Sequence, residues 1–166
     1  MPVGMQITPK FAWQNAERRI FDYLATSLAG QDGVTAFLEE YSKLAPTTGE
    51  MWTFNISGGG DGQLVPQPFY QFNAEWKGFY LKRVKAQQAW GLLLGVLPIS
   101  DGVLPGVVHV RFSGAPTIER AIMNANPDAT SPAGEIRGWS ITVPLTVNFV
   151  NSEPEIVGDS NDDRND

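Results

Sequence analysis

The chain has 166 residues, of which 42% are hydrophobic, 18% charged and 11% aromatic; this predicts a single folded domain and excludes global disorder. It contains no cysteine and one histidine, His109, which excludes disulfide bonds, a cysteine nucleophile and zinc sites built from cysteines or several histidines. The longest apolar run, Trp90 to Leu97, is far shorter than the roughly 20 residues of a membrane span, so we expect a soluble protein that is made inside the cell and does not contact a membrane.

The net charge of −6 is concentrated near one end of the chain. Residues 153–166 contain six acidic residues and one basic residue, whereas residues 1–152 contain twelve acidic and eleven basic residues. The acidic segment also has too few apolar side chains to offset the entropy lost on ordering. We therefore interpret residues 151–166 as a flexible, disordered acidic tail. The nearly neutral remainder argues against tight general binding to nucleic acid, which needs a clustered basic surface.

The first part of the chain predicts helices. Residues 1–10 contain two prolines and few polar residues, which indicates an extended arm. From Phe11 to Leu28, apolar residues recur at the spacing of an amphipathic helix. The stretch from Thr35 to Leu44, which Pro46 ends, predicts a short second helix.

A strand hairpin is predicted next. Met51 to Ser57 alternates between apolar and polar side chains, which is typical of a half-buried strand. The glycine-rich residues 58–62 form the tip of the hairpin, and Gln67 to Asn73 forms its second strand. The glycines do not make a phosphate-binding loop, because the third glycine of the dinucleotide motif is missing and prolines follow where a helix should begin.

Glu75 to Leu97 has the longest helical pattern, and Pro98 ends it. Arg83 falls inside the apolar stripe of this predicted helix. Two interpretations stay open: the charged end of Arg83 reaches solvent along the apolar surface, or it forms an ion pair between subunits.

The last part of the chain predicts strands. After a loop at 99–106, Val108, Val110 and Phe112 alternate in a third strand, with His109 on its other face. We interpret His109 as a surface or interface residue rather than a catalytic base. Residues 124–137 predict a polar, proline-rich loop.

The strongest strand pattern covers residues 139–150, where six apolar side chains alternate with polar ones. Pro144 cannot donate a hydrogen bond to a neighbouring strand, so we expect this strand to lie at an edge of the sheet or to carry a bulge. Trp139 lies beside Arg137, a combination found both in protein interfaces and at the ends of structural elements.

Together these elements predict an α+β domain over residues 11–150. We expect a mainly antiparallel sheet of four to five strands, with two main helices packed on one face. The polar face of the sheet is then exposed or in contact with another subunit.

The order of these elements resembles that of the tail terminator (tail completion, or head–tail joining) proteins of long-tailed bacteriophages. Two segments carry the resemblance. In FNAEWKGFYLKRVKAQQAWGLLLGVLP an extended stretch turns into a helix, and GWSITVPLTVNFVN forms the closing strand. The resemblance covers about residues 11–150 and places the loop at 124–137 where the family has an inter-subunit loop. An acidic tail is not a feature of the family.

The resemblance implies a structural virion protein of the tail or neck, made in the cytoplasm of a bacterial host, and not an enzyme. Such a protein forms a homohexameric ring that caps the tail tube, stops its polymerisation and joins the tail to the head. The implied partners are further copies of itself, the tail tube protein and the head-side connector. Double-stranded DNA passes through the lumen of the ring without specific binding, and no membrane, cofactor, metal or catalytic residue is implied.

The residues that we expect at subunit or tube contacts are Arg83, Arg137, Trp139, Ser140 and Thr142. Three alternatives remain: another neck or tail tube component, a binding module for a small molecule or peptide, and a small α+β enzyme. The shortage of histidine and cysteine disfavours the enzyme.

Overall fold

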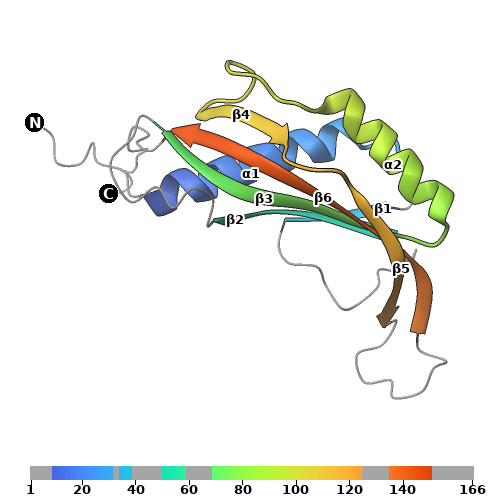
Figure 1. Ribbon diagram of the computed structural model, residues 1–166. Helices are drawn as coiled ribbons and strands as arrows, with labels where there is room; N and C mark the ends of the chain where they lie inside the picture. The colour runs from blue at the N-terminus through green and yellow to red at the C-terminus, as the bar shows by residue number, and fades with distance from the viewer. Residues whose placement is uncertain (1–8, 32–33, 39–49, 59–68, 125–134, 151–166) are drawn as a thin grey trace, which may run out of the picture.

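A computed structural model of the chain describes residues 9–31, 34–38, 50–58, 69–124 and 135–150 (Figure 1). Within these ranges the chain forms two helices and six strands, in the order α1 (Pro9–Ser27), β1 (Val34–Phe37), β2 (Glu50–Gly58), β3 (Phe69–Tyr80), α2 (Arg83–Val96), β4 (Val107–Phe112), β5 (Thr117–Asn124) and β6 (Glu135–Val150).

Several predicted features lie outside the described residues. These are the acidic tail at 151–166, most of the glycine-rich tip at 58–62, residues 1–8 of the N-terminal arm and most of the loop at 124–137. The first helix begins at Pro9, two residues before its predicted start.

The strands form one mixed sheet in the order β1-β2-β3-β6-β4, with β5 also paired to β6 (Figure 1). β1 runs parallel to β2, and the other pairs are antiparallel. The prediction of an α+β fold is confirmed. The sheet has six strands among the described residues instead of the four to five expected, because two short segments, β1 and β5, also pair with it.

The predicted helix at 35–44 is wrong where the structure describes it. Val34 to Phe37 forms strand β1, in register with Glu50 to Thr53 of β2. β-Branched and aromatic side chains favour a strand when a partner strand is available. The residues of this short segment do not by themselves indicate that β2 lies beside them. Residues 39–44 lie outside the described part of the chain.

The predicted helix at 75–97 begins too early. Glu75 to Tyr80 belongs to β3, and the helix α2 begins at Arg83. β3 is hydrogen-bonded to β2 on one side and to β6 on the other. Its buried side chains occupy both faces of the sheet, with Trp76 and Tyr80 in the main core and Phe79 in a second cluster. A run that fits a helical spacing therefore also fits a doubly packed strand.

The predicted loop at 124–137 is shorter in the structure. Thr117 to Asn124 forms β5, which the sequence analysis missed, and β6 begins at Glu135, four residues before the predicted start. The two strands pair in an unbroken register from Thr117↔Thr142 to Asn124↔Glu135. Each segment is a strand because the other supplies its hydrogen-bond partners.

The prediction for Pro144, an edge strand or a bulge, is confirmed in part. β6 is not an edge strand and pairs with β3 without a register shift, but its pairing on the other side is interrupted at Pro144. On the other side β4 pairs up to Leu145 and β5 starts at Thr142. The carbonyl of Pro144 faces this gap and accepts a hydrogen bond from the Ser113 N–H at 3.0 Å. In an antiparallel strand the amide of a residue points to the same side as its carbonyl, so the missing N–H of Pro144 leaves no strand unpaired.

Both helices pack on one face of the sheet, as predicted, and share one hydrophobic core. α1 contributes Ala16, Ile20 and Leu24 to this core, and α2 contributes Ala86, Ala89 and Leu93. The sheet contributes the alternating apolar residues of β2, β3 and β6, among them Trp52, Phe54, Ile56, Trp76, Ile141, Val143, Leu145 and Val147. Tyr23 of α1 also donates a hydrogen bond to the carbonyl of Val96 at the end of α2, at 3.3 Å.

α1 also completes the hydrogen bonding of β2 beyond the short strand β1. The N–H of Ile56 donates to Glu17 Oε2 at 2.6 Å, and the carbonyl of Ile56 accepts from Trp13 Nε1 at 3.0 Å. Covering a strand edge in this way satisfies its backbone groups and prevents it from pairing with another chain.

Replacing Glu17 by alanine leaves the Ile56 N–H without this acceptor, and we expect the free energy of unfolding to fall by about 1–3 kcal/mol in urea denaturation. Arg18→Ala is the matched control. Its ion pair with Asp22 is long, at 3.8 Å, and exposed, so its loss should change stability by no more than about 0.5 kcal/mol. Equal losses in the two variants would contradict the role assigned to Glu17.

Candidate interaction site at the projecting hairpin

The hairpin of β5 and β6 extends past the end of its neighbour in the sheet. β3 ends where Tyr80 pairs with Trp139. Four further pairs, from Ala121↔Gly138 to Asn124↔Glu135, have no third strand beside them in the described structure. Figure 1 shows this two-stranded arm projecting beyond the sheet and the helices.

A second, small core anchors the arm at its base. Met123 of β5 is buried against Met51 of β2 and Phe79 of β3, with Phe37, Ala121 and Ile136 partly buried around them. This cluster lies on the sheet face that the helices do not cover. It explains why Met51, at the start of the predicted half-buried strand, is fully buried.

Gly138 allows the arm to approach β3 closely. A Cβ atom at this position would lie 2.4 Å from the carbonyl oxygen of Tyr80 and 2.8 Å from the ring of Phe79. Both distances are too short for any side chain, and the backbone oxygen cannot move without breaking the sheet. The position therefore requires glycine for close packing, where the arm leaves the sheet.

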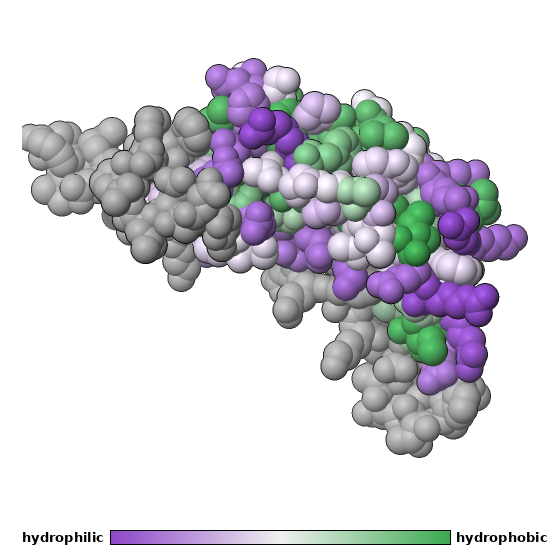
Figure 2. Space-filling model, viewed as in Figure 1, coloured by the Kyte–Doolittle hydropathy of each residue, from purple (hydrophilic) through white to green (hydrophobic). Residues whose placement is uncertain are grey.

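On the other side of the arm a pocket of about 490 Å³ opens beside the half-buried indole of Trp139. We call it the arginine pocket; its lining residues are Leu81, Arg120, Ala121, Ile122, Arg137, Gly138 and Trp139. Leu81 and Ile122 are 42% and 55% exposed, which is unusual for large apolar side chains in a pocket wall. Figure 2 shows hydrophobic and hydrophilic residues side by side on the projecting arm.

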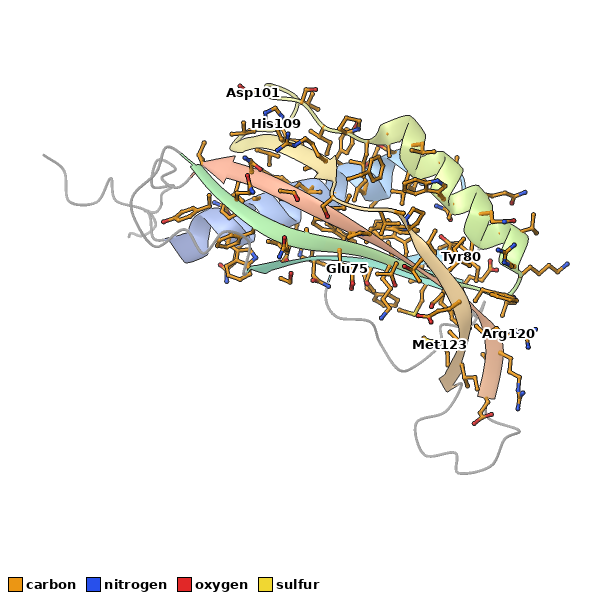
Figure 3. All side chains as sticks on the ribbon, viewed as in Figure 1. Glu75, Tyr80, Asp101, His109, Arg120 and Met123 are labelled. Carbon is orange, nitrogen blue, oxygen red and sulfur yellow. The ribbon has the colours of Figure 1, made fainter. Side chains whose placement is uncertain are left out.

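Three exposed arginines surround Trp139. The guanidinium carbons of Arg83 and Arg120 lie 5.8 Å and 5.5 Å from the centre of the indole ring, within the range of cation–π contacts. Arg137, two residues before Trp139 on β6, has Glu135 at 3.8 Å and a 77% exposed side chain. Figure 3 shows Arg120 on the arm, on the side opposite Met123.

The electrostatic surroundings do not balance this charge. Among the described residues, no carboxylate forms an ion pair with Arg83 or Arg120. Arg83 is also the first residue of α2, whose first turn contains no acidic residue. Helix N-termini favour negative charge, so these arginines meet at a place that is already electropositive.

A buried carboxylate holds the turn that carries Leu81 and Arg83. Glu50 is 4% exposed. Its Oε2 accepts a hydrogen bond from the Leu81 N–H at 3.0 Å, and its Oε1 lies 2.8 Å from Lys85 Nζ. The first residue of β2 therefore ties the β3–α2 turn to the sheet and fixes one wall of the arginine pocket.

The structure brings together three of the five residues that the sequence analysis expected at an interface. Arg137 and Trp139 line the arginine pocket, and the guanidinium carbon of Arg83 lies 5.8 Å from the centre of the Trp139 ring. Ser140 and Thr142 lie on the opposite face of the sheet, where Ser140 is buried and Thr142 half-buried. Both interpretations of Arg83 remain possible, because it is exposed and has no carboxylate partner among the described residues.

The sequence analysis missed Leu81, Arg120 and Ile122. Arg120 and Ile122 stand directly opposite Trp139 and Arg137 across the hairpin. The available signal was the strand TIERAIMN, but charged and apolar residues occur on both of its faces, so it lacks the alternation that reveals a half-buried strand.

Other candidate residues do not converge on a reactive centre. His109 is half-buried on β4, opposite Asn148 of β6, and lies far from the arginine pocket in Figure 3. Within the described ranges, no three histidine or acidic side chains lie close enough to hold a metal ion. Neither described helix combines the length and apolar character needed to cross a membrane.

No protein-family model matches the chain. The curated proteins include none with significant sequence similarity to it.

Gly138→Ala should lower the free energy of unfolding by about 1–3 kcal/mol, the usual cost of overpacking, because its methyl group collides with Tyr80 and Phe79. Gly30→Ala, after the end of α1, is the matched control: a Cβ there meets no atom within 4 Å, and alanine should change the free energy of unfolding by no more than about 1 kcal/mol. Thermal denaturation of both variants checks this. A Gly138→Ala variant as stable as the parent would show that the arm does not require glycine.

Proposed function

We propose that the chain is a structural subunit of a phage tail or neck, and that it forms a closed homohexameric ring in the manner of the tail terminator proteins that it resembles. In this proposal residues 11–150 form the tail-terminator-like domain and residues 151–166 a flexible acidic appendage. The observation that carries the proposal is the projecting arm. It extends beyond the sheet and displays Ile122 and Arg137 to solvent, with the exposed Arg120 at its base.

A second exposed apolar surface supports self-association. Leu92 and Leu94 of α2 are 47% and 52% exposed. Gly91 and Gly95 lie beside them, exposed and with open space where a Cβ would be. Two glycines inside one helix weaken it, and nothing in the described chain requires them. A helix surface of this kind allows a second protein to approach the backbone closely.

The two surfaces differ, and this matters for the symmetry of the assembly. A contact that joins the arm of one copy to α2 of the next is heterologous, and such a contact closes into a ring when its rotation allows. The sheet face that the helices leave uncovered is then free to contact the tail tube. Thr142 is half-buried on this face, whereas Ser140 is buried and contributes little surface. A subunit whose residues 1–152 carry nearly balanced charge lets DNA pass the lumen without tight binding.

The arginine pocket favours a second candidate, a binding module for an anionic small molecule or peptide. Its volume of about 490 Å³ falls within the range of small-molecule sites. Such a module needs no ring, so the oligomeric state separates the two candidates. A different ring-forming component of the phage neck or tail tube would give the same oligomeric state, so this alternative is part of the main proposal.

The native mass of the purified protein and its images in negative stain test the proposal. We expect a ring with a central hole and a mass near six times 18.2 kDa, about 109 kDa. Ile122→Asp and Leu94→Asp should each shift the mass toward the monomer without unfolding the protein, because both side chains are exposed and a buried charge is costly in an interface.

Val103→Asp is the matched control. Val103 is 50% exposed and lies in the loop of Asp101, far from the projecting arm (Figure 3). The Val103→Asp variant should therefore still form the ring. A parent protein that stays monomeric at every concentration, with or without tail tubes, would contradict the proposed ring.

A further inference from the structure

Arg83 and Arg120 have no carboxylate partner among the described residues, whereas Arg137 has Glu135 at 3.8 Å. The same sequence contains a segment with an excess of negative charge. Residues 153–166 contain the acidic residues Glu153, Glu155, Asp159, Asp162, Asp163 and Asp166, with Arg164 as their only basic neighbour. We propose that the arginine pocket of one copy binds this acidic segment of a neighbouring copy. The inference rests on the proposed function, because it requires copies in contact.

The pocket suits carboxylates in particular. A guanidinium group presents a planar set of donors that matches a carboxylate, and charge-assisted contacts of this type are among the strongest hydrogen bonds in proteins. Arg83 and Arg120 lie over the same indole ring and are exposed, so their donors stay available. Each copy has one pocket and one acidic segment, so the two are equal in number, and their charges are opposite.

The direction of β6 favours a segment from another copy. Trp139 and Val150 are eleven residues apart on this strand, or about 36 Å at the rise of an extended chain. The acidic segment begins three residues after Val150, at the end of the sheet away from the pocket. A chain reaches at most about 3.6 Å per residue, so Glu153 and Glu155, three and five residues after Val150, cannot return to the pocket of their own copy. Asp162, Asp163 and Asp166, twelve to sixteen residues after Val150, could span that distance. The first two acidic residues therefore require a neighbouring copy, and the isotope mixture described below decides between the copies for the others.

Binding in this direction adds a second heterologous contact between adjacent subunits. The pocket and the start of the acidic segment lie at opposite ends of the sheet, so each copy binds one neighbour through its pocket and the other through its segment. Contacts of this kind form a closed ring when the rotation from one subunit to the next divides a full turn evenly. Because the arginines are exposed, salt should weaken the contact strongly.

Carbodiimide cross-linking of the full-length protein tests the proposal. The reagent joins a carboxylate directly to a lysine amine, and Lys82 adjoins both Leu81 and Arg83 of the pocket. A second reporter, Arg120→Lys, places an amine within the pocket lining and keeps its charge. An equal mixture of copies labelled with ¹⁴N and ¹⁵N, combined before assembly, distinguishes links between copies from links within one copy.

We expect peptides of residues 153–166 joined to Lys82 and to the lysine of the Arg120→Lys variant, with mixed-isotope pairs at the level of random pairing. In the double variant Arg83→Ala/Arg120→Ala the Lys82 link should fall roughly tenfold or more, since two charge-assisted contacts are lost. Arg111→Ala, at an exposed arginine of β4, is the control and should leave the link unchanged. Salt at ~1 M, where screening acts within about 3 Å, should remove it.

Three results would overturn the docking: no link at either reporter, links only between peptides of the same isotope, or a Lys82 link that survives the double variant. Native mass measured on the same samples separates this failure from a failure of the ring. Rings without these links overturn the docking alone, whereas a monomer without mixed-isotope links overturns both proposals.

Discussion

The structure depends on one long strand. β6 has sixteen residues, and along this length it pairs with β3 on one side and with both β4 and β5 on the other. Its inner face carries the central residues of the core under both helices. Because β6 continues past the end of β3, its first four residues and their partners in β5 leave the sheet as a projecting arm. The arm is therefore a consequence of strand length and register rather than a separate module.

The arginine pocket lies where this arm leaves the body of the protein, and three elements build it. β5 and β6 supply Arg120 and Arg137, the turn before α2 supplies Leu81, and α2 begins with Arg83, which lies against the Trp139 ring. Glu50 fixes that turn with its buried carboxylate. The apolar members of this cluster, Leu81 and Ile122, stay exposed in the single chain and add little to its core. This exposure is what motivates the proposed assembly.

The sequence by itself determined the elements whose side chains follow one clear period. The helix beginning near residue 11, the strand at 51–57 and the strand at 139–150 each show a single apolar face, because their apolar side chains pack mainly in the core under the helices. Met51 is an exception, because it packs in the second core on the other face of the sheet. The placement of both helices on one face of an α+β sheet follows from the same pattern. The residue types of Arg83, Arg137 and Trp139 also suggested an interface, and the structure brings the three side chains together.

Only the tertiary structure decided the elements that depend on a distant partner. Val34 to Phe37 is a strand because β2 accepts it, and Thr117 to Asn124 is a strand because β6 extends far enough to pair with it. Glu75 to Tyr80 has neighbours on both edges and buried side chains on both faces, which hides the strand period. Arg120 joins Arg83 around Trp139 across a separation of 37 residues, and no local pattern records that meeting. Spacing along the chain reports packing on one face, whereas pairing between distant segments is a property of the whole fold.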